Sequence, residues 1–383
     1  MIGYSIEDII RITGGTLVPA DYSGECKLNE LVMDSRAVKK DDIFVALTGG
    51  ATDGHKYIPA AFELGAGCCL AEHIEAPQAG PVILVKDTLL AMQQIAAEFE
   101  KNPEYKAGIM ENHGVVLCGD DIAEAYQRFE TLELCARTIL NAKTLGRPNF
   151  LSNEQLQFHE SRLPNDFQHF MNVTHPSDER AIRAEICKIV RRACDQKLMS
   201  SSYGTVSVRW QGNDFLITPP GIQRWDIDEE DIVQIKDGMA EAGKTPSHSA
   251  ALHYEIYRRN PKVNAIILTQ CPSLMGFCTT DAKFDVRTIP ESWIFLQDVP
   301  KFEFGSQYTK MNDIAETFKS RSCVMLANDS VIVASNSLIN AFDRLEVAEF
   351  AAKSLILAKP LGKLHPITDA QVEDLRVAFH VGK

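Results

Sequence analysis

Short apolar runs alternate with helix-period segments along the first hundred residues. Ser5 begins an amphipathic segment over residues 5–12 that carries Asp8 at the fourth place, which predicts a helix with a capping box. The same helical period predicts helices at 57–64 and 89–99, and apolar runs between turns predict strands at 31–33, 43–47, 68–71 and 82–85. Alternating strands and helices are typical of an α/β fold, so we expect a small α/β domain at residues 1–102.

The stretch TPSHSAALHYEIYRRNPKVNAIILTQC, residues 245–271, combines a helix and a strand in the later part of the chain. Helical period predicts a helix over 250–259, Asn260 and Pro261 end it, and an apolar strand follows over 263–268. The strand runs into Thr269, Gln270 and Cys271. In α/β folds the polar end of a strand is where binding sites usually lie, so this stretch is the first candidate for a site.

Part of the sequence occurs twice. Residues 109–147 reappear 216 residues later without a gap, and both copies read as a strand, a turn and a long helix that ends at Leu-Gly. Asn112, Arg128 and Gly146, for example, correspond to Asn328, Arg344 and Gly362. The first copy is predicted to supply one strand and one helix with no sheet of their own. We therefore expect it to dock on a neighbouring part of the chain or on a partner, because a lone strand leaves its edge unpaired.

Composition and charge narrow the classes of partner. The chain has 383 residues, of which 45% are hydrophobic and 24% charged, as in ordinary globular proteins. Its formal net charge of −13, with no basic stripe to offset it, disfavours nucleic acid and anionic membranes. No apolar run approaches the roughly 18 residues that cross a bilayer. Ten scattered cysteines without a CxxC pair, behind an N-terminus that does not read as a signal peptide, predict reduced thiols in the cytoplasm.

Residues 177–370 resemble the class II aldolase/adducin family. The motifs occur in the family's order: YGTVSVR at 203–209, FLITPPG at 215–221, Pro246-Ser247, a helix carrying His253, Asn264-Ala265 and Phe304-Gly305-Ser306. Residues 104–150 resemble the C-terminal part of the same domain, including Asn112-His113-Gly114. The resemblance implies an α/β/α layered domain at 177–383, preceded by a partial segment at 103–150 and a linker at 151–176.

The resemblance also implies a reaction. In the family, zinc held by three histidines polarises the substrate's carbonyl and a glutamate moves the proton, so that a sugar phosphate is cleaved by a carbon–carbon lyase. The same resemblance implies a small sugar or sugar phosphate as ligand and a homo-oligomer, a tetramer. Here Ser249 stands at the glutamate position, and the zinc positions hold Leu268, Gln270 and Asp329. We therefore expect the complete domain to be impaired or inactive alone, and its catalytic residues are unknown.

Some binding groups of the family remain. Thr218, Gly221, Ser247 and His248 correspond to the phosphate-binding region, where hydroxyls and backbone N–H groups can donate to an anion. His113 is the one family-type zinc ligand left, and it could complete a site if a partner chain brought a histidine pair.

The run from residue 34 to 73 resembles the N-terminal domain of the Mur ligases, through its Asp34-Ser35-Arg36 and Asp53-Gly54-His55 motifs. The resemblance implies that Ser35, Arg36, Asp53 and His55 lie near the uridine diphosphate end of a sugar nucleotide. The alternative is that Asp34 and Arg36 tie a turn together. An ATP-binding P-loop directly follows that domain in the ligases, whereas 102–105, NPEY, follow here, so ligase activity is not expected.

Three functions remain open from the sequence. The first is a metal-dependent sugar-phosphate aldolase, the second a non-catalytic binding or assembly module of the adducin type, and the third a protein that binds nucleotide sugars through residues 1–102.

Overall fold

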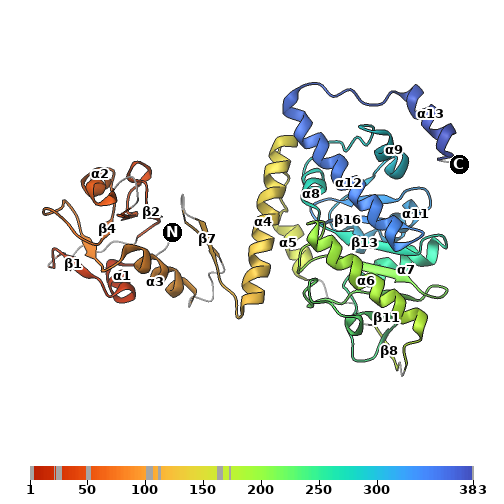
Figure 1. Ribbon diagram of the computed structural model, residues 1–383, viewed down its shortest axis with the longest axis horizontal. Coiled ribbons are helices and arrows are strands. Elements are labelled where there is room, and N and C mark those ends of the chain that lie inside the picture. The colour runs from red at the N-terminus through yellow and green to blue at the C-terminus, as the bar shows by residue number, and fades with distance from the viewer. Residues whose placement is uncertain are drawn as a thin grey trace. The chain divides into compact units, whose positions relative to one another are not determined.

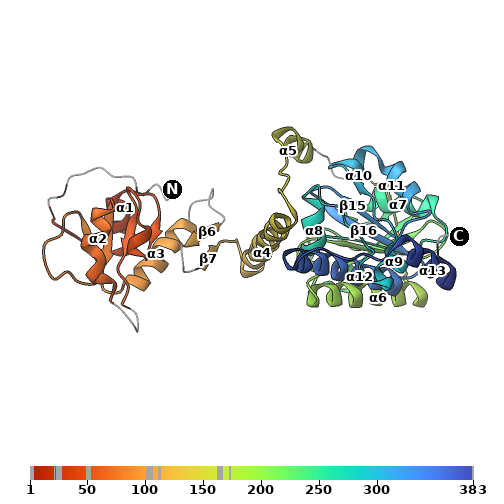
Figure 2. The same ribbon diagram turned by 90° about the horizontal axis from the view of Figure 1, so that it is seen from above.

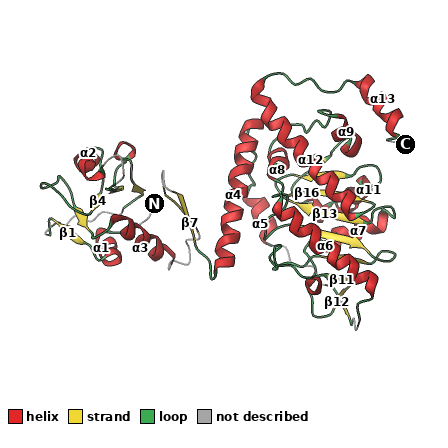
Figure 3. Cartoon of the chain, viewed as in Figure 1, coloured by secondary structure: helices red, strands yellow, loops and turns green. Residues whose placement is uncertain are grey.

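The computed structural model describes residues 4–20, 22, 28–48, 53–100, 107–110, 114–161, 167–171 and 174–381. The chain divides into two compact units, Met1–Phe129 and Glu130–Lys383. Both are mixtures of helices and strands (Figure 1, Figure 3). Within the described ranges, none of the helices has both the length and the hydrophobicity that crossing a bilayer requires.

The elements described in the first unit include every helix and strand that the sequence pattern predicts, in the predicted order, and also two strands and two short 3-10 helices that it does not predict. They are α1 (Ile6–Thr13), β1 (Thr16–Val18), β2 (Leu31–Val32), η1 (Ser35–Ala37), β3 (Ile43–Val45), η2 (Gly54–Tyr57), α2 (Ile58–Glu63), β4 (Cys68–Ala71), β5 (Val82–Leu84), α3 (Thr88–Glu100), β6 (Ala107–Met110), β7 (Gly114–Leu117) and the start of α4 (Ile122–Leu145). The capping box at α1 is confirmed, because the Ser5 hydroxyl accepts from the N–H of Asp8 and the Asp8 carboxylate accepts from the N–H of Ser5.

A five-stranded sheet in the order β1-β5-β4-β3-β2 forms the centre of this unit. Strands β2 to β5 are parallel and β1 is antiparallel to β5. Alternate residues of β4 face opposite sides: Cys68 and Leu70 pack with α1 and α3, while Cys69 and Ala71 pack with α2. Burial of both faces explains why these strands read as continuous apolar runs.

The partial copy differs from its prediction in one respect. Strands β6 and β7 pair antiparallel as a two-stranded sheet, so the expectation of a single strand with no sheet is wrong. These elements repeat β15 (Cys323–Leu326) and β16 (Ser330–Ser335) at the offset of 216 residues, and α4 and α12 (Leu338–Ala358) begin at the same offset. The C-terminal part of α4 belongs to the second unit, where Asn141 donates to the carbonyl of Pro272 over 2.9 Å.

The second unit holds the remaining elements. They are α5 (Asn153–Glu160), β8 (His169–Phe170), α6 (Ser177–Asp195), β9 (Thr205–Arg209), β10 (Phe215–Ile217), η3 (Glu229–Asp231), β11 (Val233–Lys236), β12 (Met239–Glu241), α7 (Ala250–Arg259), β13 (Ala265–Thr269), α8 (Pro272–Cys278), α9 (Pro290–Leu296), β14 (Lys301–Phe302), α10 (Ser306–Thr309), α11 (Met311–Thr317), β15, β16, α12, η4 (Lys359–Leu361) and α13 (Asp369–Phe379). The helix predicted at 250–259 is confirmed to the residue.

A nine-stranded sheet runs through this unit in the order β14-β15-β16-β13-β9-β10-β11-β12-β8. All its pairs are antiparallel except β14 with β15 and β12 with β8. One face packs against α6, α8, α9 and α12, and the other against α7 and α11 (Figure 2). This arrangement is the predicted α/β/α layering.

Candidate functional site

Three strand ends meet at one edge of the nine-stranded sheet. Strand β13 lies between β9 and β16 and is antiparallel to both, with Leu268 opposite Thr205 on one side and Ile332 on the other. The last residues of β13 therefore meet the first residues of β9 and β16. We call this region the strand-end site and define it by Thr205, Ser247, Ser249, Leu268, Gln270 and Asp329.

A line of hydroxyl groups occupies the side of the site next to β9. The Thr205 and Ser247 hydroxyls are 2.7 Å apart, and the Ser247 hydroxyl is 3.2 Å from that of Ser249. Thr205 and Ser247 are buried, while Ser249 is half-buried just before α7. Small neutral donors thus take the place in which the family resemblance expects a carboxylate.

Thr218 and Gly221 lie on the turn that follows β10. The Thr218 hydroxyl is buried and accepts from the N–H of Val206 over 3.2 Å, so it is used within the sheet. Gly221 is exposed, with a φ of 76°, and a Cβ there would meet nothing within 4 Å. Arg224 fixes this turn by donating to the carbonyls of Gly204 and Ile222. His248 is exposed beside Ser247.

The side of the site next to β16 is a network of amides and one carboxylate. The Gln270 side-chain amide donates to the Asp329 backbone carbonyl over 2.7 Å. The Asp329 carboxylate accepts from Gln307 over 2.6 Å and from the Ser330 hydroxyl over 2.9 Å. Leu268 packs among apolar side chains of the α7 face. The structure thus brings together the three positions at which the resemblance expects zinc ligands.

Gln307 is a member of this network that the sequence reasoning missed. It is 6% exposed, and its Oε1 has no hydrogen-bond partner among the described residues. The signal that could have found it is its place directly after Phe304-Gly305-Ser306, one of the motifs that carries the resemblance.

His253 and Cys271 lie deeper and are not exposed to a ligand. The Nδ1 of His253 is 2.7 Å from the Ser207 hydroxyl, which is 2.8 Å from the Tyr257 hydroxyl. Burial lowers the pKa of His253 to about 3, so the imidazole is neutral. Burial also raises the pKa of the Cys271 thiol well above its usual range, and the thiol donates to the carbonyl of Leu198, which is the behaviour of a packed cysteine.

The candidate nucleotide residues of the first unit gather at one edge of the five-stranded sheet. Ser35 and Arg36 lie on η1, just after β2, and Asp53 and His55 lie at η2, after β3. Because β2 to β5 are parallel, the segments that follow them meet at the same edge, which is where ligands bind in open α/β sheets.

Arg36 makes the turn contact that the alternative reading predicts. Its guanidinium donates to both carboxylate oxygens of Asp34, over 2.9 and 2.7 Å, and this hydrogen bonding lowers the pKa of Asp34 to about 2. The Arg36 side chain is nevertheless 88% exposed, so it can be reached from solvent.

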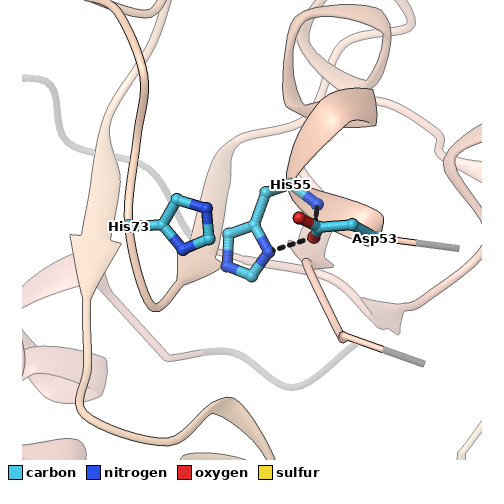
Figure 4. Close-up of side chains that lie close together, drawn as sticks. All are labelled: Asp53, His55 and His73. Carbon is cyan, nitrogen blue, oxygen red and sulfur yellow. Dashed lines mark hydrogen bonds and ion pairs between the residues drawn. The ribbon is translucent and has the colours of Figure 1, made fainter. Parts of the chain in front are cut away.

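Asp53, His55 and His73 form a cluster in which potential metal-ligating atoms lie within 4.8 Å of one another. Figure 4 shows the His73 ring beside the His55 ring and Asp53 on the other side of His55. The two rings are stacked with centroids 4.1 Å apart.

Both ring nitrogens of His55 are already used. The Glu72 backbone N–H donates to Nε2 over 3.0 Å, so Nδ1 carries the proton and donates to Asp53 over 2.6 Å. A metal ion would have to displace one of these bonds. The cluster therefore acts as a tie between the turn after β3 and the end of β4.

His113 and a P-loop-like run at residues 238–245 are two further features of the sequence. His113, the candidate zinc ligand, lies outside the described residues. Residues 238–245, GMAEAGKT, fit the P-loop pattern G-x-x-x-x-G-K-T, but Glu241 lies in β12 and α7 begins only at Ala250. Lys244 is paired with Glu241 over 3.1 Å. The run is thus part of a β-hairpin and its following turn, without the strand, loop and helix of a phosphate cradle.

Comparison with known proteins matches most of the chain to one family. The sequence model described as the class II aldolase and adducin N-terminal domain matches residues 45–140 and 184–356. The two matches end 216 residues apart, which is the offset of the internal repeat. Both resemblances found in the sequence are supported by relatives.

The aldolase-like part and the Mur-like part of the chain have different relatives. An L-fuculose phosphate aldolase of Methanocaldococcus jannaschii is 32% identical over 180 residues, 46% of this chain and 96% of the relative. A 3-oxo-tetronate 4-phosphate decarboxylase of Haemophilus influenzae is 28% identical over 185 residues, 45% of this chain and 85% of the relative. A UDP-N-acetylmuramoyl-L-alanyl-D-glutamate--2,6-diaminopimelate ligase of Bacteroides thetaiotaomicron is 42% identical over 89 residues, 22% of this chain but 18% of the ligase.

Among solved structures, a sugar-phosphate aldolase from Thermotoga maritima aligns with a TM-score of 0.43 and 20% identity, covering 49% of this chain and 98% of that one.

Proposed function

We propose that this chain, which belongs to the class II aldolase and adducin family, binds a small sugar phosphate at the strand-end site and does not cleave it by zinc chemistry. The proposal joins the family's substrate class to the side chains that stand in this particular site.

The observation that carries the proposal is the state of the three zinc positions. Leu268 offers no donor atom, the Gln270 amide donates to the Asp329 carbonyl, and the Asp329 carboxylate accepts from Gln307 and Ser330. Zinc requires three or four nitrogen, sulfur or oxygen donors directed at one point. These residues do not fit a zinc ion, and no step through a metal follows from them.

The absence of a carboxylate at Ser249 supports the same conclusion. Proton transfer in an aldol cleavage needs a group that can hold and release a proton near neutral pH. Ser249 instead continues the hydroxyl line of Thr205 and Ser247. Neutral hydroxyls can donate to phosphate oxygens but cannot replace a general base without an activating partner.

The names of two relatives support the ligand class. The Methanocaldococcus relative is named for L-fuculose phosphate and the Haemophilus relative for 3-oxo-tetronate 4-phosphate, both of them small phosphorylated sugar derivatives. Exposed His248 beside Ser247 and the backbone N–H groups of the turn at Gly221 would complete the proposed anion site, whereas the Thr218 hydroxyl is used within the sheet and would only hold that turn in place.

Calorimetric titration with L-fuculose 1-phosphate, with L-fuculose as the unphosphorylated control, tests the proposal. We expect binding of the phosphate that persists in a metal chelator, no cleavage product, and roughly tenfold weaker binding after Ser247→Ala, since one hydrogen bond to a charged group is lost. Ser320→Ala, an exposed serine on another face, should bind as the parent does. Cleavage by the parent chain, or equal binding by Ser247→Ala, would count against the proposal.

A second candidate function is favoured by the carboxyl edge of the five-stranded sheet. Exposed Arg36 lies there beside the turn after β3, and the relative of this part is named for a UDP-N-acetylmuramoyl substrate. Thermal shift with UDP-N-acetylmuramoyl-L-alanyl-D-glutamate tests it, because a ligand stabilises the folded state once its concentration exceeds the Kd. A shift that disappears in Arg36→Ala supports the function, and no shift at millimolar ligand contradicts it.

Assembly as a homo-tetramer belongs to the same proposal, since it is implied by the family resemblance. Sedimentation velocity of the full chain measures it directly.

A further inference from the structure

A segment between the two copies of the repeat contacts two elements next to the strand-end site. It comprises residues 149–160, which lie between the two ranges that match the family model, 45–140 and 184–356. Its second half is helix α5, which begins with a capping box between Ser152 and Gln155. We call residues 149–160 the strap. All of it belongs to the second unit, as the strand-end site does.

Asn149 bonds the start of the strap to the turn between β15 and β16. Its backbone carbonyl accepts from the Asn328 side chain over 2.7 Å, its backbone N–H donates to the Thr279 carbonyl over 2.7 Å, and its side chain donates to Asp281 over 2.9 Å. Asn328 has a left-handed backbone, with a φ of 54°, and directly precedes Asp329. The strap is therefore bonded to the residue next to the carboxylate of the site.

Phe158 packs α5 against α10, the short helix that carries Gln307 (Figure 2). The Phe158 ring meets the Tyr308 ring edge to face, with centroids 6.4 Å apart. A Cβ on Gly305 would come within 2.9 Å of the Phe158 ring, so this glycine leaves the room that the ring occupies. Gly305 and Tyr308 stand two residues before and one residue after Gln307, so α5 contacts the element that places the Gln307 side chain.

Helix α5 depends on ring contacts for its position. None of its residues is buried, and a helix of eight residues is marginally stable by itself in water. A second ring contact, between His159 and Phe304 with centroids 6.4 Å apart, falls on the segment just before α10. An element held by a small and partly exposed contact has a low local stability, which is common for segments beside ligand sites.

Asp329 gives the strand-end site a side that accepts hydrogen bonds. Its carboxylate accepts from Gln307 and Ser330, and a carboxylate has about four lone-pair positions, so it can also accept from a ligand hydroxyl. The hydroxyls of Thr205 and Ser247, which can donate to a phosphate, lie next to β9 on the other side of β13. Since neighbouring strands are about 5 Å apart, β9 and β16 lie about 10 Å apart, and a sugar phosphate can span that distance.

We propose that the strap positions Asp329 to accept from the hydroxyl groups of the sugar, with Phe158 and Asn149 as positioning residues. The proposal rests on the proposed function, because it concerns the same ligand at the same site. Phe158 acts through α10 and Gln307, whose amide donates to the Asp329 carboxylate over 2.6 Å. Asn149 acts through Asn328. A segment outside the family match thus holds Asp329 from two sides.

Hydrogen exchange of the unliganded chain tests whether α5 holds α10. The Lys310 amide donates to the Ser306 carbonyl across α10, over 2.8 Å, and its exchange reports the opening of this helix. Phe158→Ala should speed that exchange about three- to tenfold, the contribution of one aromatic pair. Leu156→Ala shortens an exposed leucine of the same helix and should leave the exchange unchanged.

Calorimetric titration with L-fuculose 1-phosphate and with inorganic phosphate tests the effect on the ligand. Phe158→Ala should weaken binding of the sugar phosphate about three- to tenfold and leave inorganic phosphate unchanged, because inorganic phosphate needs the hydroxyl line alone. Asn328→Gly removes the side-chain bond to Asn149, keeps the left-handed backbone and should have the same selective effect. Leu156→Ala should bind both ligands as the parent does.

The outcomes separate this proposal from the proposed function. A parent chain that binds neither ligand overturns the proposed function and, with it, the role of the strap toward a sugar. If the parent chain binds both ligands, an equal loss of both in Phe158→Ala, or no loss of either, overturns the role of the strap alone. Unchanged exchange of the Lys310 amide in Phe158→Ala also overturns it, whatever the ligands do.

Discussion

Leu140 and Ile356 occupy the same position in the two copies of the repeat. The structure predicts that replacing Ile356 by alanine lowers the free energy of unfolding much more than replacing Leu140. Ile356 on α12 is 6% exposed and belongs to the main core of the second unit, whereas Leu140 on α4 is 65% exposed. Both lie within Glu130–Lys383, so one unfolding transition reports on both. The pair therefore separates the effect of burial from the effect of sequence position.

The magnitude follows from the surface that each side chain buries. Ile356→Ala removes buried methyl groups and leaves a cavity, at a cost of about 3 kcal/mol, within the range for isoleucine to alanine in cores. Leu140→Ala removes a side chain that is mostly in water already, so its cost should stay below about 1 kcal/mol. Alanine has the higher helix propensity of the two at that exposed position, which offsets part of the loss.

Urea denaturation followed by tryptophan fluorescence measures both variants. The three tryptophans, Trp210, Trp225 and Trp293, all belong to the second unit, so the signal reports on that unit alone. With an m-value of about 2 to 3 kcal/mol per molar urea, Ile356→Ala should lower the midpoint by roughly 1 M and Leu140→Ala by under about 0.4 M. Equal shifts, or a larger shift for Leu140→Ala, would refute the assignment of α12 to the core and of this α4 position to the surface.

Three other perturbations have definite expected outcomes. Arg183→Met leaves two buried carboxylates, Glu179 and Glu241, without the guanidinium that contacts them at 2.6 and 3.0 Å. It should lower the free energy of unfolding in urea by about 3 to 5 kcal/mol, whereas the exposed Arg258→Met should lower it by under about 0.5 kcal/mol. Burial holds the pKa of His253 at about 3, below its ordinary 6.5, so the unfolded chain binds a proton that the folded chain does not between those pH values. The contribution of His253 to the free energy of unfolding is therefore fully present above pH 6.5 and is lost on acidification, by up to about 1.4 kcal/mol per pH unit, which corresponds to one proton taken up on unfolding. His253→Asn should lack this part of the pH dependence. His55→Ala should speed hydrogen exchange at the Glu72 amide, whereas added zinc should leave exchange in the parent chain unchanged; slower exchange with zinc would indicate a metal site instead of a tie.

The fold was predictable where local pattern and burial agree. The apolar runs at 43–47 and 68–71 predicted β3 and β4 because both faces of that sheet are covered. Strand β6 was missed because Ala107 and Gly108 weaken its strand signal, although its repeat counterpart, Cys-Val-Met-Leu, is strongly strand-forming. Helix α6 starts at Ser177, where Pro176 precedes the helix and the acidic first turn complements the helix dipole.

The motifs in the sequence predicted which positions belong to the strand-end site, but they did not predict the contacts between those residues. The contact between Gln270 and the Asp329 carbonyl joins residues 59 apart in sequence, and it depends on the register of β13 against β16. The role of Gln307 follows from the position of α10, which no local pattern gives. The P-loop pattern at 238–245 shows the reverse case, in which a matching sequence folds as a hairpin and its turn, with Lys244 paired to Glu241.

Under the proposed function, the strand-end site has the family's frame without a place for zinc. The most direct test measures the metal content of the purified chain beside a variant that restores the expected ligands and carboxylate: Leu268→His, Gln270→His, Asp329→His and Ser249→Glu. The parent chain should contain under about a tenth of a zinc ion per chain, and the folded variant about one. A parent chain that carries one zinc ion, lost on mutation of Gln270 or Asp329, would contradict the claim.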